Sequence, residues 1–401
     1  MKQAKKETNP IKSFAQFMFI VYIFVMFMFS FQSDLVKYTE YVFILFALVV
    51  VIYIVSTRTL ILAKEHFYLL AFCLISLLTS VWAINFNTAF NSSISLFILV
   101  IMSILVYQIF DKEEVDILLK AVFYAGIALV ILTLINAGFG NYFDAILSGK
   151  RLGGAMNAPN TFGVYCSISF VLGLYLLKDK KIFHTIMLLI LFSGILASGS
   201  RNAFIITAIG SFVAMLFAFK NMTSKEKVFM IILVLILLLA LYLFGFFNNI
   251  FSRMENLGGS SDIQDIEDPS LQSRLFMFTF GLENFIYKPI FGYGINNAQF
   301  LLEEYFARTY LHNNYIELLV DVGAVGFFFY YINHISLMKS LFKQRSGKLE
   351  IPEILFTIFI VLLVADISIV YYYNKLTYIV LTMGMIANKE SSKQTKGEIS
   401  Q

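Results

Sequence analysis

Residues that could transfer a proton gather in one short stretch, RTYLHNNYIELLVDVG. His312 stands just before a strongly apolar run that opens with Asn313 and Asn314 and contains Glu317 and Asp321. A neutral imidazole can accept a proton from a hydroxyl group at pH 7. Asparagine is a typical residue for capping free N–H groups at the start of a helix. The stretch therefore predicts a histidine at the entrance of a membrane helix.

Two acids follow His312 inside the apolar run. Asn313, Glu317 and Asp321 are spaced by four residues, so we expect them on one helix face. A carboxylate inside a membrane span costs about 2.5–3.5 kcal/mol to insert, and such acids usually face a polar cavity or a partner. Glu317 could orient the His312 ring or pair with an arginine. The plainer alternative makes His312 an amphipathic anchor at the membrane interface.

Arginine gives the second chemical signal. Arg201 lies in the short turn SGSRN, Arg274 opens the amphipathic stretch SRLFMFTFGLENFIY, and Arg151 lies in KRLGGAMNAPNTFG. Guanidinium groups keep their charge and match phosphate oxygens with two parallel hydrogen bonds. We therefore expect these arginines to bind a diphosphate. The alternatives are an anchor at a helix end for Arg201 and a snorkelling side chain for Arg274.

The segment 150–163 allows two interpretations. In the first, it is a loop in which Asn160 or Thr161 caps the following helix. In the second, its backbone approaches a phosphate at a helix N-terminus, and Arg151 adds positive charge there. The sequence leaves both interpretations open.

The elements that must position these residues are membrane helices. Of the 401 residues, 59% are hydrophobic and 14% are charged, and the mean hydropathy is +0.78. Soluble proteins carry about 25% charged residues, whereas here apolar runs of about 18 residues recur from end to end. The sequence predicts an all-α polytopic membrane protein with about twelve spans. We place them at 14–31, 38–56, 66–84, 92–109, 117–136, 161–177, 182–198, 200–219, 227–247, 314–337, 352–370 and 374–388.

Basic residues predict the orientation. With both termini in the cytoplasm, 21 of the 30 lysines and arginines lie in inside segments, as the positive-inside rule requires. Arginines that stand outside against this bias need a reason other than orientation. The residues left outside are Lys37, Lys150, Arg151, Arg201, Arg253, Arg274, Lys288, Arg308 and Lys375.

We expect four regions along the chain. Residues 1–247 form the N-terminal membrane helices, with about nine spans, and the first of them, 14–31, lacks a cleavage site and stays in place. Residues 248–313 form an extracellular loop with amphipathic helices. Residues 314–388 form about three further spans, and 389–401 form a cytoplasmic tail.

Other features have plain interpretations. Cys73 and Cys166 lie in apolar runs, so we expect neither a disulfide nor a cysteine-ligated metal. Asp366 lies near the outer end of a span, and Tyr371–Tyr373 are typical of an interfacial aromatic belt. No phosphate-binding loop, dinucleotide fingerprint or zinc spacing occurs. The basic residues are spread between spans, which indicates no nucleic-acid partner.

Four segments occur in the order seen in the O-antigen ligase and O-antigen polymerase superfamily, and the chain resembles that superfamily over about 150–330. They are RLGGAMNAPNTFGVY, SGSRNAF, SRLFMFTFGLENFIYKPIFGYGINNAQF and HNNYIELLVDVGAVG. The resemblance implies an integral membrane glycosyltransferase of the GT-C type. Such enzymes act on the outer face of the cytoplasmic membrane. They transfer a glycan from undecaprenyl diphosphate to an acceptor hydroxyl with inversion, and use no nucleotide sugar, metal ion or other cofactor.

The resemblance also implies roles for single residues. Arg201 matches the arginine of the family's Ser-Arg turn, and Arg274 matches the arginine that opens the outer-loop helix, so both would bind the diphosphate. His312 matches the histidine of the His-Asn motif and would deprotonate or position the acceptor. Arg151 is expected to join the diphosphate contacts. Substrate-binding or supporting roles are expected for Asn160, Asn313, Glu317 and Asp321.

We expect a polymerase that joins undecaprenyl-diphosphate-linked oligosaccharide repeat units into capsular, exo- or O-antigen polysaccharide. The Phe-, Ile- and Lys-rich composition is typical of a low-GC Gram-positive bacterium, which has no lipid A. The first alternative is a ligase that transfers a finished glycan to another acceptor. The second is a flippase for lipid-linked oligosaccharide, which would place cations deep within its spans. Expected partners are the carrier-linked oligosaccharide and the lipid bilayer, with a flippase and a chain-length regulator as further candidates.

Overall fold

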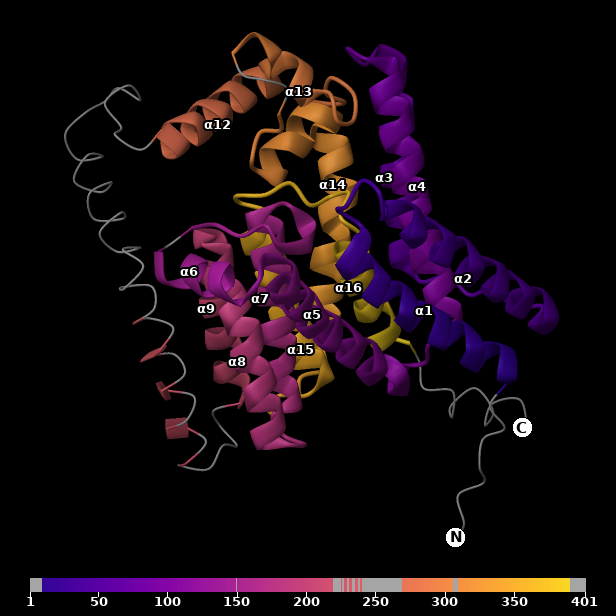
Figure 1. Ribbon diagram of the computed structural model, residues 1–401. Coiled ribbons are helices and arrows are strands. Elements are labelled where there is room, and N and C mark those ends of the chain that lie inside the picture. Colours follow the sequence, from indigo (N-terminus) through magenta and orange to yellow (C-terminus); the bar gives the residue numbers. More distant parts are fainter. Residues whose placement is uncertain are drawn as a thin grey trace.

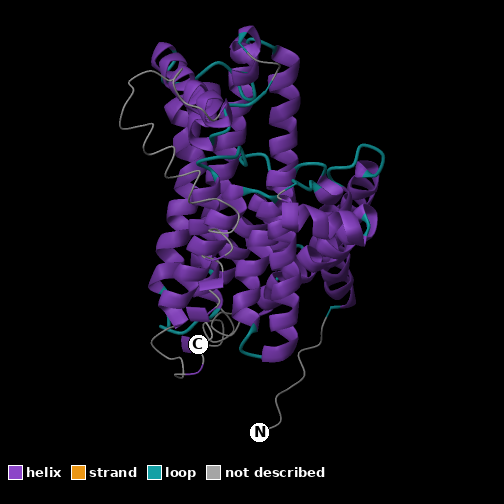
Figure 2. Ribbon diagram, turned by 60° about the vertical axis from the view of Figure 1, so that its left-hand side comes forward, coloured by secondary structure: helices purple, strands orange, loops and turns teal. Residues whose placement is uncertain are grey.

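The computed structural model describes residues 9–148, 150–218, 269–305 and 309–389, together with scattered positions between 225 and 239. Every regular element in these ranges is helical, and no strand occurs in them (Figure 2). The predicted all-α fold is confirmed, and the chain is a multi-pass membrane protein. Most of the predicted span 227–247, the loop residues 248–268 and Arg308 lie outside the described residues.

Nine helices in the described ranges are long and apolar enough to cross a membrane. Two shorter apolar helices, α15 (Ile351–Ala365) and α16 (Lys375–Ala387), follow them. Every predicted span except 227–247 coincides with one of these helices, whereas the total of twelve is not confirmed. The long helices are α1 (Pro10–Phe29), α2 (Val36–Thr57), α3 (Lys64–Thr79), α4 (Phe86–Ile109), α5 (Val115–Ala137), α7 (Pro159–Leu176), α8 (Lys181–Ser198), α9 (Arg201–Ala218) and α14 (Asn314–Lys343).

Several shorter elements connect the long helices. Three are α-helices: α6 (Phe139–Ser148), α12 (Pro269–Tyr287) and α13 (Ala298–Leu301). The others are single turns of 3-10 helix: η1 (Ser80–Trp82), η2 (Lys112–Glu114), η3 (Gly154–Met156) and η6 (Leu302–Glu304). In Figure 1, α12 and α13 lie at one end of the molecule, above the bundle that contains α5, α7, α8 and α9.

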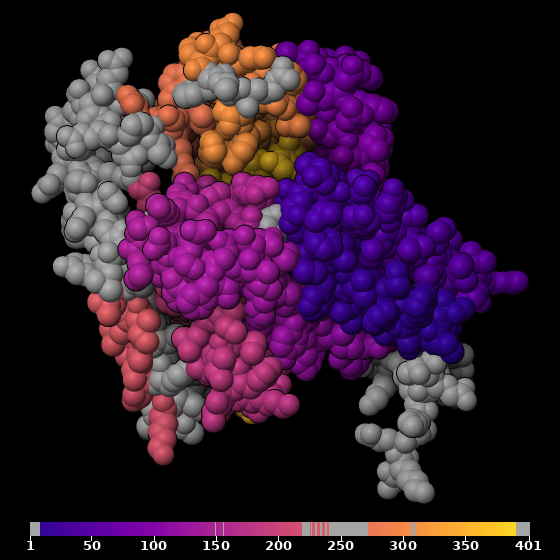
Figure 3. Space-filling view, in the orientation of Figure 1, coloured from indigo at the N-terminus to yellow at the C-terminus, as the bar shows by residue number. Residues whose placement is uncertain are grey.

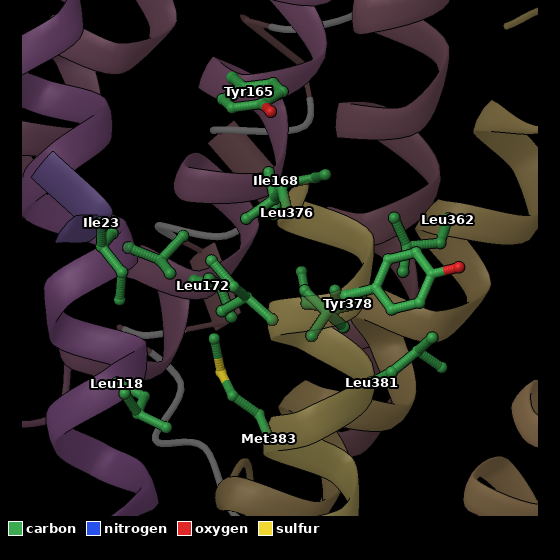
Figure 4. Packing of buried hydrophobic residues seen from close by; sticks show 14 of the residues in the cluster. Ile23, Leu118, Tyr165, Ile168, Leu172, Leu362, Leu376, Tyr378, Leu381 and Met383 are labelled. Carbon is green, nitrogen blue, oxygen red and sulfur yellow. The ribbon is translucent and has the colours of Figure 1, made fainter. Parts of the chain in front are cut away.

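Helix α7 lies at the centre of the bundle, because it packs against α5, α8, α9 and α15. All of its residues from Phe162 to Leu176 are buried, as expected for a helix that is apolar on every side. Figure 4 shows Tyr165, Ile168 and Leu172 of α7 beside buried residues of α1, α5, α15 and α16. Helix α2, in contrast, exposes Val55 and other large apolar residues, which suits a helix that faces lipid.

The residues between α12 and the start of α14 have a hydrophobic core of their own, separate from that of the bundle. Helix α12 packs closely on the first turns of α14, since a Cβ added at Gly281 would overlap the Ile316 side chain. We call residues 269–305 the α12–α13 module, which appears in orange at the top of Figure 3. The buried members of this core are Met277, Ala298, Leu302, Leu311, Ile316 and Val320.

Helix α14 is interrupted at Gly323, whose φ of 66° and ψ of −172° are not helical. The backbone groups freed there pair with the module. The carbonyls of Val320 and Asp321 accept hydrogen bonds from the N–H groups of Tyr293 (2.9 Å) and Gly294 (2.8 Å). Beyond the break, the Ala324 N–H donates to the Pro289 carbonyl at 2.8 Å. An interrupted membrane helix is tolerated only where other groups satisfy its backbone, so residues 289–294 make the break possible.

The same segment also contacts the turn between α3 and α4. Trp82 Nε1 donates to the Gly292 carbonyl at 3.2 Å, and the Asn85 N–H donates to Asn297 Oδ1 at 2.7 Å. The α12–α13 module is therefore fixed to the bundle on two sides, by α14 and by the α3–α4 turn.

Replacing Gly323 by alanine should destabilise the protein strongly. A Cβ there would overlap the backbone carbonyl of Ile290, and the backbone conformation is one that glycine alone adopts readily. We expect a lower midpoint of thermal unfolding for Gly323→Ala in detergent. The matched control is Gly347→Ala, because Gly347 also has a positive φ, of 78°, but no atom lies within 4 Å of an added Cβ. Equal midpoints for the two variants would contradict this account of the break.

Candidate functional site

The first part of the site is a corner at which α7, α8 and α9 meet. Asn160, in the first turn of α7, accepts two hydrogen bonds at its Oδ1, from Arg151 Nη2 (2.6 Å) and from Ser200 Oγ (3.1 Å). The loop that carries Arg151 is attached to α8 by the Leu152 N–H, which donates to the Ala197 carbonyl at 2.9 Å. Asn160 thus fixes Arg151 beside the turn that carries Arg201.

The close approach of these helices depends on their sequence. A Cβ added at Gly163 would lie 2.6 Å from Ser198 Oγ and 2.7 Å from the Ala203 Cβ, so only glycine lets α7 reach the α8–α9 turn. The turn itself is left-handed at Gly199, with φ of 54°, as is common after a helix C-terminus. Because Ser200 ends this turn, Arg201 becomes the first residue of α9.

The second part of the site is Arg274 on α12. Burial lowers the pKa of Arg274, and the positive charges of Arg201 and Arg151 lower it further. Partial burial and the charge of Arg201 lower the pKa of Arg151 in the same way. The structure therefore brings the three predicted arginines together, although they lie far apart in the sequence. Among the described residues, no carboxylate forms an ion pair with Arg151 or Arg274.

The third part of the site is His312. Its φ is 55°, a left-handed conformation that few residues other than glycine adopt and that histidine tolerates better than most. Its Nδ1 is buried and has no hydrogen-bond partner in the described part of the chain. Burial, and then the positive charge of Arg274, lower the pKa of His312 to about 4. The imidazole is therefore neutral at pH 7, and one of its nitrogens is not used by the fold.

The neighbours of His312 hold its unusual backbone in place. On one side, the Leu311 N–H donates to Glu317 Oε2 at 2.6 Å. On the other, Asn313 Oδ1 accepts from the Ile316 N–H at 3.1 Å, which confirms the predicted helix cap. Residues in such sparsely populated conformations cost about 1–3 kcal/mol and persist only where their surroundings fix them.

Asn314 differs from its prediction as a second cap. Its Oδ1 accepts hydrogen bonds from the N–H groups of Tyr371 (2.9 Å) and Tyr372 (3.0 Å), and its Nδ2 donates to Tyr331 Oη. Its own N–H donates to the carbonyl of Asp366 at 2.8 Å. Asn314 therefore ties the start of α14 to the turn between α15 and α16.

The predicted capping of α7 by Asn160 or Thr161 is wrong. The helix begins at Pro159, so Asn160 and Thr161 lie inside its first turn, and Ala158, which precedes it, makes no side-chain cap. Proline is favoured in the first turn because it lacks the N–H that would need capping. The side chain of Asn160 is instead used by Arg151 and Ser200, as described above.

The two acids of α14 bind backbone N–H groups, and in the described part of the chain Glu317 lacks the partners that were considered for it. Within the described residues, Glu317 pairs with the Leu311 backbone rather than with the His312 ring or an arginine. Asp321 is fully buried and accepts from three successive N–H groups, those of Asn296, Asn297 and Ala298, at 2.8–2.9 Å, and from Tyr372 Oη at 3.2 Å. Both acids hold the α12–α13 module and the His312 turn in place, so they support the site without facing it.

Two tyrosines near His312 were missed as site residues. The Tyr310 ring lies 4.2 Å from the His312 ring, centroid to centroid. Tyr371 lies close enough to Tyr310 to interact electrostatically, and its buried hydroxyl has no hydrogen-bond partner in the described residues. The predicted aromatic belt is therefore wrong for Tyr371 and Tyr372, which are 4% and 1% exposed, whereas Tyr373 is 47% exposed.

Asp366 supports the same region. Its Oδ2 accepts from Tyr331 Oη at 2.9 Å, and its carbonyl accepts from Asn314, so its place is structural. Across the described residues, no group of three or more His, Cys, Asp or Glu side chains is arranged to hold a metal ion.

Fold and site together define an all-α polytopic membrane protein with an arginine cluster beside a neutral histidine. The family model described as O-Antigen ligase matches residues 186–331, a range that includes Arg201, Arg274 and His312. The match confirms the predicted resemblance to the O-antigen ligase and polymerase superfamily. It indicates a function of ligase or polymerase type. A search of curated proteins found no match.

Replacing Asp321 by asparagine should loosen the α12–α13 module. The amide keeps one acceptor oxygen but turns an NH₂ group toward N–H donors, and each buried donor left unsatisfied costs about 1–3 kcal/mol. We expect faster cleavage by chymotrypsin after Tyr287, which is 79% exposed, in Asp321→Asn than in the unchanged protein. The exposed Asp179 of the α7–α8 turn provides the control, Asp179→Asn. Equal cleavage rates after Tyr287 in the two variants would show that Asp321 does not hold the module.

Proposed function

We propose that this protein joins undecaprenyl-diphosphate-linked oligosaccharide repeat units into a polysaccharide, with inversion of the anomeric centre and without a metal ion. The observation that carries the proposal is the meeting of Arg151, Arg201 and Arg274, from three separate segments, beside His312. Like charges repel, so a cluster of cations is best explained by an anion that binds among them. A diphosphate supplies the charge and the oxygen geometry that guanidinium groups match.

The reaction divides between the arginines and the histidine. The acceptor hydroxyl oxygen attacks the anomeric carbon, and the bond from that carbon to the phosphate oxygen breaks. The carrier diphosphate leaves with additional negative charge, which the three arginines stabilise. The proton of the acceptor hydroxyl passes to His312 Nδ1, or Nδ1 orients the hydroxyl while the proton leaves with the phosphate.

The pKa of His312 should differ between the free protein and its complex with the donor. With a pKa of about 4, the imidazole is a weak base in the absence of substrate, because general bases work best when their pKa lies near the working pH. A bound diphosphate would offset the charge of Arg274 and add negative charge nearby, and both effects favour the protonated imidazole. The donor would therefore raise the basicity of His312 as it binds.

The proposed location is the outer face of the cytoplasmic membrane, with both termini in the cytoplasm. It is supported by the excess of lysine and arginine in the segments assigned to the inside. On that face the carrier-linked units would be supplied by a flippase, and a chain-length regulator is a second proposed partner. A ligase would use the same donor site and differ in its acceptor, so both tests below apply to the donor chemistry of either enzyme.

Replacing the arginines by lysine should remove most of the activity. Lysine keeps the charge but loses the two parallel hydrogen bonds, and a hydrogen bond to a charged group contributes about 1.5–3 kcal/mol. We expect Arg201→Lys and Arg274→Lys each to slow polymer formation by about tenfold to a hundredfold. The assay is reconstituted protein with synthetic carrier-linked repeat units, read on a gel. Arg345→Lys, at the far end of α14, should leave the rate unchanged. If Arg201→Lys and Arg274→Lys both formed polymer at the rate of the unchanged protein, these arginines would be structural anchors only.

The pH dependence should report on His312. Because the neutral imidazole is the active form, the rate should fall as pH falls through the histidine pKa. The pH at which kcat/KM falls should lie near the pKa of His312 in the free protein, about 4. The pH at which kcat falls should be higher, because the bound diphosphate raises the pKa of His312. His312→Gln keeps a hydrogen-bonding group but cannot take a proton, so its kcat should not fall in this pH range. His312→Ala should slow transfer by about 10²–10⁴-fold. An unchanged pH profile in His312→Gln would exclude the histidine as the titrating group.

A further inference from the structure

Helix α6 carries an apolar stripe that is exposed among the described residues. Phe139, Phe143 and Leu147 are spaced by four residues, so they lie on one helix face. Their exposed fractions are 70%, 42% and 83%. The rings of Phe139 and Phe143 contact each other, with centroids 4.5 Å apart. We call these three residues the α6 stripe, which extends for about 12 Å along the helix.

The opposite face of α6 fixes the helix to the bundle. Tyr142 and Ala145 are buried, and the Tyr142 hydroxyl hydrogen-bonds Ser193 Oγ of α8 at 2.9 Å. Ser193 lies in the last two turns of α8, near Ala197, which holds the loop of Arg151. The α6 stripe is therefore held at the same end of α8 as the arginine cluster.

The stripe also leads directly into that cluster along the chain. Leu147 is four residues before Arg151, whose guanidinium is fixed by Asn160 and lies within electrostatic reach of Arg201. A ligand that places a diphosphate among the arginines and carries a long hydrocarbon chain would match both features at once. Once the diphosphate is bound, its own chain is present near the stripe at a high effective concentration, which favours it over unattached membrane lipid.

We propose that the α6 stripe binds the first part of the polyprenyl chain of the carrier whose diphosphate occupies the arginine cluster. This inference rests on the proposed function, because it takes the donor to be a lipid diphosphate. Hydrocarbon moved from the bilayer to a protein face gains packing contacts rather than hydrophobic free energy. The stripe therefore orients the chain, and with it the diphosphate, more than it increases affinity.

Photo-crosslinking can test the contact. A benzophenone amino acid replaces Leu147 in one variant and Ile182 in another, and Ile182 is 81% exposed at the opposite end of α8. The probe is a polyprenyl diphosphate that carries one labelled sugar, in vesicles of ordinary phospholipid. We expect capture of the probe from position 147 to exceed that from position 182 by about tenfold. Adding Arg201→Lys to the 147 variant should reduce capture, because the diphosphate no longer holds the chain near α6.

Two outcomes would overturn the inference. One is equal capture of the probe at positions 147 and 182. The other is capture at position 147 that Arg201→Lys leaves unchanged, since the stripe would then contact any membrane lipid. A kinetic readout supports the same conclusion: Leu147→Ala should raise KM about threefold for a long-chain carrier and leave it unchanged for a carrier truncated to two isoprene units. Failure of the unchanged protein to form polymer from either carrier would instead count against the proposed function, which separates the two hypotheses.

Discussion

The site depends on the interruption of α14 at Gly323. A continuous helix would use its own carbonyls at Val320 and Asp321, and residues 289–294 would have no backbone partners there. The interruption joins the first half of α14 to the α12–α13 module, and the second half of α14 remains part of the bundle. Because His312 precedes the first half and Arg274 lies in the module, their relative position follows from this one exchange of hydrogen bonds.

Electrostatic repulsion explains why the fold must be firm around the arginines. The charge of Arg201 lowers the pKa of both Arg151 and Arg274, and such like charges would separate if their backbones were free to move. Instead, Arg151 is bonded to Asn160, Arg201 begins a helix after a tight turn, and α12 is pressed against α14 at Gly281. The cluster is thus organised in advance for the anion that we propose binds there, as electrostatic stabilisation of a leaving group requires.

Sequence reasoning identified what depends on composition and local spacing. Apolar runs predicted the long membrane helices of the described residues. Three of the arginines that break the positive-inside pattern, Arg151, Arg201 and Arg274, lie together in the structure. It did not find the interruption of α14, since GAVG at 323–326 looks like ordinary membrane helix and its partner, 289–294, is distant in the chain. For the same reason the backbone N–H partners of Glu317 and Asp321 were not predicted, and Tyr371 was placed at a lipid interface although it is buried.

The left-handed backbone of His312 has a consequence for how this site can change over time. At this position glycine would relieve the strain, so the most stabilising replacement is also one that removes the reactive ring. If His312 acts as proposed, stability and activity are therefore opposed at a single residue, a trade-off that is common where function needs a strained conformation. Selection for activity would therefore have to retain His312 against substitutions that make the protein more stable but inactive. The hydrogen bonds of Leu311 and Asn313 stabilise the chain on either side of the strained residue.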